Sequence, residues 1–540
     1  MSRPNRRMLT LPSAQELTQG TDPIRLRKKK DRFLFMTYNL LAQALVRRDM
    51  FPHASQKALR WKFRRQNLLQ EFLAFGPDLA CLQEVDFWDE FYYPNLTKAG
   101  YETAYYKNKN KKHGCAIIWR KTRFEKVDQQ TLEYDDVGQP TFMTGNIGLM
   151  VGLKPLKHTA ENPDPNADML LADETEDDES AGIKANGAEE TNTPGGLLVA
   201  TTHLFWRPDG SYERLRQASI LLEKVKEWNQ NLKFTVLLGG DFNTTPRDAA
   251  YRAMTRNEMP PHQIPNLEKW LVDEVTRVQQ AEAEPSSKQG NSGDTKDTGS
   301  VGEQKTDIID RLAAQTEKLG LEETSSVSQN GKTDGNSADL PYRAPPTGIM
   351  LPKHSAAKAS AIEDRLQSTI VDPADFAASE DPKIKHLAAV DASGGVGGED
   401  ARVVAPLEAF TPPRNLMTTV EAHSRCISIY GQYEDLTKDN PAEVDAAAAA
   451  AIAAEESTAT KAKTDYTHGE PVFTNFATWF KDTLDYVYLL DEPLPENGAR
   501  LVPLRLLEIP DQSHLGHGLP NENFSSDHLC LMVEFAILAK

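Results

Sequence analysis

The chain has 540 residues, and its 61 Lys and Arg against 79 Asp and Glu give a formal net charge of −18 at pH 7. This length could hold three or four domains of ordinary size, and the acidity argues at first against a nucleic-acid partner, because phosphate binding needs local positive charge. The sequence contains no apolar run long enough to cross a bilayer, so no membrane span is expected.

The chain begins with a basic stretch. Residues 1–30 have a net charge of +6, and we expect them to form a flexible tail. The segment 25–32, RLRKKKDR, is typical of a nuclear signal or of a segment that attracts RNA. The opening MSRPNRRM has a weaker similarity to a mitochondrial presequence. We expect a cytoplasmic or nuclear location rather than a mitochondrial one.

Short apolar runs after residue 31 predict buried strands, and they alternate with amphipathic helical patterns at 58–75 and 211–228. The predicted strands, in chain order, cover 33–39, 79–84, 114–119, 146–153, 197–204, 234–243, 484–490 and 528–538. Mixed strands and helices predict an α/β (α+β) sandwich. Four cysteines without a CxxC pair are typical of reduced thiols in an intracellular protein.

Three acidic stretches interrupt these elements. Residues 161–190 carry a net charge of −10, residues 281–413 carry −9 and residues 441–470 carry −4. They are rich in like charges, in small polar residues or in alanine, so we expect disordered inserts, with a short helix at 306–321. Without the inserts and the tail, 317 residues remain with a net charge of −1. The net charge of the whole chain therefore does not exclude an RNA partner, and residues 31–540 are predicted to be one interrupted domain.

Polar residues lie at the ends of several predicted strands, where they either follow the strand or open it. They are Asn39, Glu84, His203, Asp241, Asn243, Asp485, Asp527 and His528. Each residue alone has a structural explanation, such as a capping carboxylate or an Asx turn that closes a strand. Chemistry often collects at strand ends on a rigid scaffold, so the complete set predicts a site.

The order of these motifs resembles the endonuclease/exonuclease/phosphatase superfamily, in the branch of the carbon-catabolite-repressor-like deadenylases and nocturnin. It resembles in particular the Ngl-type RNA exonucleases of fungi. The resemblance covers about 33–153, 196–258 and 420–538, and it includes HLFWRPDGSYERLRQ and FTNFATWFKDTLDYV. It implies one catalytic domain, in which a two-sheet β-sandwich is flanked by helices in four layers.

Phosphodiester hydrolysis requires charge neutralisation and an activated water. The resemblance implies that Glu84 and Asn39 bind Mg²⁺, with Mn²⁺ as an alternative. Asp241 would orient or deprotonate the water, and Asn243 would project on the same side of an extended segment. His203 and His528 would donate to phosphoryl oxygens or shuttle protons.

Two further carboxylates complete the predicted set. The resemblance places Asp485 with His528 in the catalytic set, and Asp527 is a supporting residue. Either carboxylate could orient a histidine, and the residues alone leave that pairing open.

Substrate contacts are predicted on both sides of this set. Lys111 and Lys112, in the loop KNKNKKH, and Arg207 could contact phosphates, whereas Arg214 could equally be a helix-surface charge. The resemblance favours Phe476 as the ring that stacks on a base, with the alternative being Trp206.

The sequence thus predicts a Mg²⁺-dependent 3′→5′ exoribonuclease that acts on single-stranded RNA, either poly(A) tails or the 3′ ends of rRNA precursors. Two alternatives stay open. One is a nocturnin-like phosphatase that removes a 2′-phosphate from a dinucleotide, and the other is a non-catalytic RNA-binding relative. A monomer is expected, and no protein partner is predicted.

Overall fold

Two mixed β-sheets organise the chain in its computed structural model, which describes residues 6–13, 32–156, 195–283, 401–438, 468–477 and 480–538. In spatial order, the first sheet contains β1 (Met8–Thr10), β16 (Arg500–Leu507), β17 (Leu531–Leu538), β2 (Arg32–Asn39), β3 (Leu79–Val85), β5 (Gly114–Arg120) and β4 (Tyr101–Tyr106). The second contains β12 (Cys426–Ser428), β15 (Asp485–Leu490), β10 (Thr235–Asp241), β9 (Leu197–Thr202), β8 (Ile147–Pro155) and β6 (Phe124–Glu133).

Two strand pairs are parallel, one in each sheet, among the residues that the structure describes. They are β2 with β3 and β9 with β10. Two small antiparallel pairs lie outside the main sheets: β7 (Phe142–Met143) with β11 (Ala401–Arg402), and β13 (Asn475–Phe476) with β14 (Lys481–Asp482). The parallel pairs matter for function, because the carboxyl ends of parallel neighbours lie at the same edge of a sheet.

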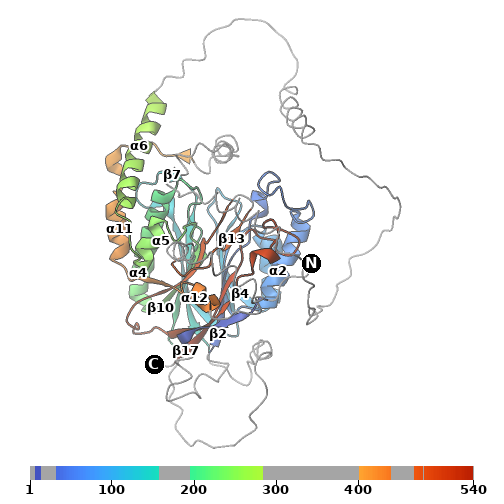
Figure 1. The fold of residues 1–540 in the computed structure, drawn as a ribbon. Helices are drawn as coiled ribbons and strands as arrows, with labels where there is room; N and C mark the ends of the chain where they lie inside the picture. Colours follow the sequence, from blue (N-terminus) through green and yellow to red (C-terminus); the bar gives the residue numbers. More distant parts are fainter. Residues whose placement is uncertain are drawn as a thin grey trace, which may run out of the picture. The chain divides into compact units, whose positions relative to one another are not determined.

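Helices cover the outer face of each sheet (Figure 1). The α-helices are α2 (Trp61–Phe75), α3 (Tyr93–Lys98), α4 (Ser211–Leu232), α5 (Ala249–Thr255), α6 (Gln263–Ala283), α11 (Pro413–Glu421) and α12 (Tyr433–Lys438). Single helical turns are η2 (Gln43–Leu45), η3 (Trp88–Tyr92), η4 (Tyr134–Asp136), η7 (Leu407–Ala409) and η8 (Gln512–His514). Helix α2 packs on the first sheet, and α4, α5, α6 and α11 pack on the second.

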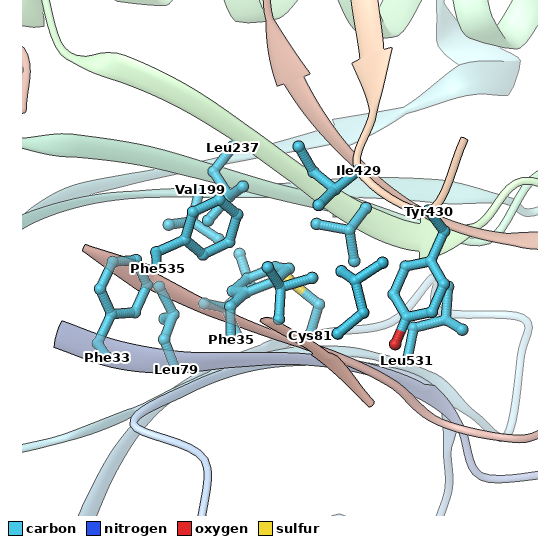
Figure 2. Packing of buried hydrophobic residues seen from close by; sticks show 14 of the residues in the cluster. Phe33, Phe35, Leu79, Cys81, Val199, Leu237, Ile429, Tyr430, Leu531 and Phe535 are labelled. Atoms are coloured by element: carbon cyan, nitrogen blue, oxygen red, sulfur yellow. The ribbon is translucent and has the colours of Figure 1, made fainter. Parts of the chain in front are cut away.

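The alternation of side chains along β2 shows why the domain has four layers. Phe33 and Phe35 point into the core between the sheets, whereas Leu34 and Met36 pack under α2. Figure 2 shows Phe33 and Phe35 in the core opposite Val199 of the second sheet. Because both faces of the central strands are buried, these strands read as continuous apolar runs in the sequence. The predicted four-layer sandwich is confirmed.

All eight predicted strands are present, as are the helices predicted at 58–75 and 211–228, most of them with shifted ends. Strands β1, β4, β6 and β16 were not predicted, because their apolar runs are short or, in β6, one face is exposed. Helix α6 was not predicted either, and its last residues, 281–283, overlap the predicted second insert. All four cysteines are buried free thiols. No helix in the described ranges has the length and apolar character needed to cross a membrane.

Two predicted boundaries differ from the structure. Residues 6–13, expected in the flexible tail, include β1, which pairs with β16, and Arg6, which donates to the carbonyl oxygens of Glu508 and Cys530. Residues 401–413, expected in the second insert, include β11 and the buried Phe410. The insert 161–190 and the helix 306–321 lie outside the described residues, as do most of 281–413 and 441–470.

Candidate active site

The ends of the two parallel strand pairs meet at one edge of the sandwich and bring the predicted polar residues together. Asn39 ends β2, Glu84 lies at the end of β3, and His203 forms an isolated bridge with Asp241 just beyond β9. The Asn39 amide donates from Nδ2 to Glu84 Oε1 at 3.1 Å and to Asp241 Oδ2 at 2.8 Å. One amide therefore joins a carboxylate from each sheet.

A bulge aims the side chain of Glu84. The pairing of β3 with β5 shifts register between Leu82 and Val85, and Glu84 has a φ of 53°. The Ala42 backbone N–H donates to Glu84 Oε2 at 2.9 Å and holds the carboxylate in place. A left-handed conformation of a non-glycine residue costs on the order of 1–3 kcal/mol, and such strain collects at functional sites. Leu41, Phe87 and Asn243, near the same edge, also have positive φ.

The glycine pair before Asp241 is required by close packing. A Cβ on Gly239 would lie 2.7 Å from the Phe35 ring across the sandwich, and one on Gly240 would lie 2.6 Å from the Thr202 carbonyl oxygen. These contacts bring the ends of β2, β9 and β10 close together. The motif GGD thus combines a packing requirement with a polar residue at the site.

Asp485 and His528 form a buried pair. The His528 Nδ1–H donates to Asp485 Oδ2 at 2.7 Å, and the Thr474 hydroxyl donates to the same oxygen at 2.6 Å. Burial alone would lower the pKa of His528, but the carboxylates of Asp485 and Asp241 hold that pKa well above its usual value. The pairing that the sequence left open is therefore Asp485 with His528, and Nε2 lies 3.7 Å from Asp241 Oδ2.

The pKa shifts of His203 and Asp241 favour their neutral forms, whereas the shift of His528 favours its charged form. Burial, opposed by the nearby positive charge of His528, raises the pKa of Asp241 to about 7. His203 Nε2 lies 3.6 Å from Asp241 Oδ2 and 3.8 Å from Glu84 Oε1. Burial and the positive charge of Lys111 hold the pKa of His203 well below its usual value, so its imidazole is neutral. A carboxyl group with a near-neutral pKa beside imidazoles is suited to proton transfer.

The donor set fits a divalent cation at Glu84. Burial and, to a smaller extent, the nearby negative charge of Asp527 raise the pKa of Glu84. Asp527 Oδ1 is buried and has no hydrogen-bond partner among the described residues. Asp241, Asp485 and His528 also offer ligand atoms within 4.8 Å of one another, but His528 is engaged with Asp485 and protonated. Glu84 and Asp241, which both accept hydrogen bonds from the Asn39 amide, offer two carboxylates to a divalent cation.

Asn39 differs from its predicted role as a metal ligand. Its carboxamide oxygen accepts the Leu41 backbone N–H at 2.9 Å, and this bond turns the NH₂ group toward the two carboxylates. The Ser526 hydroxyl donates to the Asn39 carbonyl oxygen at 2.6 Å. In this orientation Asn39 positions Glu84 and Asp241 and presents donors, not a ligand oxygen.

Asn243 also differs from the predicted geometry. The strand β10 ends at Asp241, so Asn243, with a φ of 48°, does not continue an extended segment. Its backbone N–H donates to Asp241 Oδ1 at 2.9 Å, which is the Asx turn that the sequence offered as an alternative. Its side-chain NH₂ donates to the Leu204 carbonyl oxygen at 2.9 Å. Asn243 therefore holds the Asp241 carboxylate in place.

The predicted phosphate-binding residues lie in different settings. Lys111 Nζ donates to Asn146 Oδ1 at 2.6 Å, near His203, while Lys112 is exposed. Arg207 donates to the Asp209 carboxylate at 3.0 Å, so its charge is already compensated. Arg214 is buried against Asp248 and is not a surface charge.

The predicted base-stacking ring is not accessible. Phe476 is only 4% exposed, and its ring packs against Phe473 in the main core. Burial of FTNF in the β13–β14 pair is a tertiary effect that the sequence does not reveal. Trp206, the alternative, is 48% exposed and follows His203 in the chain.

Several residues of the site were missed. The His113 ring lies 6.3 Å from that of His203, and burial lowers the pKa of His113 to about 3. Thr474 and Ser526 orient Asp485 and Asn39, and buried Arg64 donates to the carbonyl oxygens of Leu40, Leu41 and Ser525. Of these residues, only His113, in KNKNKKHG, could have been noticed in the sequence, because it is next to the lysine-rich loop. Thr474, Ser526 and Arg64 act through tertiary contacts.

Comparisons with known proteins agree with the fold. A model of the Endonuclease/Exonuclease/phosphatase family matches residues 36–290. The chain is 36% identical over 242 residues to RNA exonuclease NGL2 of Saccharomyces cerevisiae, covering 42% of each chain. It is 38% identical over 255 residues to the probable RNA exonuclease C9B6.11c of Schizosaccharomyces pombe, covering 46% of this chain and 42% of that one. These matches span less than half the length of either relative.

Among solved structures, ANGEL2, whose structure is described as that of a 2′,3′-cyclic phosphatase, is 18% identical to this chain. It has a TM-score of 0.48 and covers 98% of both chains.

Proposed function

We propose that the chain is a member of the endonuclease/exonuclease/phosphatase family and that it is a divalent-cation-dependent hydrolase that removes nucleotides from the 3′ ends of single-stranded RNA. The observation that carries the proposal is the convergence of Glu84, Asp241 and the Asp485–His528 pair at one buried edge. Carboxylates beside an imidazolium suit an anionic phosphodiester that must be neutralised and attacked by water. The proposal that RNA is the substrate rests on the similarity to relatives that are named RNA exonucleases.

In this proposal, Glu84 and Asp241 hold the cation, Mg²⁺ or Mn²⁺, which supplies positive charge to the phosphoryl oxygens when bound. Asp241 also lies within reach of both histidines. Its carboxylate can accept a hydrogen bond from the attacking water and orient that water toward the phosphorus. Asn39 and Asn243 fix its two oxygens, since each donates to a different one.

The two histidines have separate roles in the proposed reaction. His528 is protonated and oriented by Asp485, so its Nε2–H is a charged donor for a non-bridging phosphoryl oxygen. His203 is neutral, and its Nε2 faces the two carboxylates. It can accept or pass on a proton without adding fixed charge.

A cleavage assay tests this function. Purified protein with Mg²⁺ is incubated with an A-tailed RNA labelled at its 5′ end and with an rRNA-like 3′ extension. We expect a ladder of progressively shorter labelled products, lost with EDTA and with Glu84→Gln. The matched control is Glu125→Gln, which removes an exposed carboxylate at the far end of β6 and should leave cleavage unchanged.

Other outcomes point to other activities. Release of phosphate alone, from a 2′-phosphorylated dinucleotide or from an RNA with a terminal cyclic phosphate, would replace the nuclease with a phosphatase. RNA binding without cleavage under every cation condition would make the chain a binding module.

A further inference from the structure

The segment that leads into α2 has the opposite charge to the rest of the chain. Residues 45–65 contain seven Lys and Arg and one acidic residue, Asp49, in a chain with a net charge of −18. The first turn of α2 contains no acidic residue, and Arg60 stands at its N-cap with Lys62 just inside. Cations at a helix N-terminus oppose the helix dipole, so this placement does not serve the stability of the helix.

These cations are available to a ligand. Lys57, Arg60 and Lys62 are exposed, and Arg65 is half-buried. Lys57 lies over the Phe63 ring at 4.8 Å and Arg65 over the Phe91 ring at 5.3 Å. Within the described ranges, no carboxylate forms an ion pair with any of the four. Arg60 donates only to the neutral Gln56 side chain at 3.1 Å.

An aromatic pair, of which one ring is exposed and the other half-buried, lies beside the cations. The Phe87 ring is 42% exposed and stacks on Trp61 of α2, with the ring centroids 4.7 Å apart and the planes 22° from parallel. Phe87 has a φ of 47°, a conformation that a bulky residue rarely adopts. The fold therefore holds a large apolar ring in solvent at a cost in backbone strain.

The pair is close to the candidate active site. Phe87 follows Glu84 by three residues, a separation of at most ~11 Å along the chain. The buried Arg64 guanidinium ties α2 to the loop after Asn39 and, through the Ser525 carbonyl, to the loop before His528. The Ala44 backbone N–H donates to Asp86 at 3.2 Å, so the same loop also contacts the turn that carries Phe87.

We propose that Lys57, Arg60, Trp61, Lys62, Arg65 and Phe87, here called the α2 strip, bind the single-stranded RNA segment on the 5′ side of the scissile phosphate. Phe87 stacks on an unpaired base, and the cations contact successive phosphates. An exonuclease site that holds the 3′ end leaves the rest of the strand to run outward in the 5′ direction. The proposal rests on the proposed function for that direction, while binding itself requires no catalysis.

Binding is measured by fluorescence anisotropy of a labelled twenty-nucleotide oligoadenylate in EDTA, over a range of salt concentrations. The double variant Arg60→Gln/Lys62→Gln should bind about tenfold more weakly. The slope of log K against log salt should become smaller by roughly 1.4, since each lost phosphate contact contributes about 0.7 on single strands. The matched control is the double variant Lys121→Gln/Lys154→Gln, which should change neither quantity. Both lysines are exposed and lie at the ends of β5 and β8 that are farther from the candidate active site.

A second variant tests the aromatic contact. In Phe87→Asn the ring is removed, but the residue still tolerates a positive φ, so folding should be retained. We expect about tenfold weaker binding of the oligoadenylate with an unchanged salt slope, because stacking is not ionic. Binding of a fully paired duplex should not change, since its bases are not free to stack. Equal losses for duplex and single strand would overturn the stacking role.

The outcomes separate this proposal from the proposed function. If both variants match the control in affinity and salt slope, the α2 strip does not bind RNA. If they bind weakly but no RNA is ever cleaved, the strip stands and the nuclease proposal fails. With active enzyme, the double variant should raise the KM for the long substrate about tenfold and leave turnover of a trinucleotide unchanged. A loss on both substrates would mean that the residues support the active site and not the strand.

Discussion

Replacement of Asp485 by Asn tests the electrostatics of the proposed active site most directly. The change keeps the shape of the side chain but removes the charge that accepts the His528 Nδ1–H at 2.7 Å. A buried hydrogen bond to a charged group is worth about 1.5–3 kcal/mol. Its loss makes protonation of His528 roughly 10- to 150-fold less favourable, because 1.36 kcal/mol corresponds to a factor of ten. The pKa of His528 should fall toward the ordinary value of a histidine.

The sign of the pH effect follows from this shift. In the unmodified protein the His528 pKa is raised, so the protonated form persists above neutral pH. In Asp485→Asn, the proton is lost at lower pH, and cleavage that requires the imidazolium declines as the pH rises toward 8. At neutral pH we expect kcat to fall by up to about 10- to 150-fold, the factor by which protonation of His528 becomes less favourable.

Two measurements check this expectation: an NMR titration of His528 and the pH dependence of kcat. Thr474→Val serves as the graded comparison, because it removes only a neutral donor, at 2.6 Å, from the same carboxylate oxygen. It should shift the profile much less than Asp485→Asn. An unchanged His528 titration in Asp485→Asn would refute the pairing, and a kcat loss without a pH shift would refute the role of His528 as a charged donor.

Three further predictions follow from burial and packing. Burial raises the pKa of Glu470 to about 7, so the stability that its bound proton provides is complete below pH 4.5 and is lost as the pH rises through 7. Across this range the free energy of unfolding, measured by urea denaturation, should fall by about 3 kcal/mol, and Glu470→Gln should remove that fall. Gly239→Ala places a Cβ 2.7 Å from a buried phenyl ring, so the free energy of unfolding should fall by about 1–3 kcal/mol in the same assay. A short Gly-Ser linker in place of 284–400 should preserve the melting temperature, because the flanking segments already meet where Gln279 Nε2 donates to the Ala405 carbonyl oxygen at 3.0 Å. Removal of 281–413 should lower the melting temperature, because it also removes β11 and a buried aromatic side chain.

Residues that end buried strands could be predicted well from the sequence. Apolar runs marked β2, β3, β9 and β10, and a polar residue at the end of each run marked Asn39, Glu84, His203 and Asp241. The structure brings all four together, because both parallel pairs end at the same edge. This success has a local cause: a strand buried on both faces is continuous in the sequence, and the change from apolar to polar marks its end.

Residues whose role depends on orientation could not be predicted. Asn39 and Asn243 have the side chains that the family pattern implies, but the Asx bonds to Leu41 and Asp241 decide which atoms face the site. The α2 strip could not be predicted from the sequence for a related reason. Its cations are ordinary in a helical pattern, and only the stacking of Trp61 on Phe87 places them beside a residue that follows Glu84 by three positions.

The sequence by itself determined the fold class, the order of the strands along the chain and the identity of the polar residues at their ends. These properties depend on hydrophobic burial and on local backbone preferences, which are written residue by residue. Only the tertiary structure decided that Asp485 pairs with His528 and that Phe476 lies in the core. It also decided that residues 401–413 belong to the domain and that an acidic chain has a basic strip near its candidate active site. Each of these depends on contacts between distant segments, because hydrogen bonds, burial and charge act over distances in space and not along the chain.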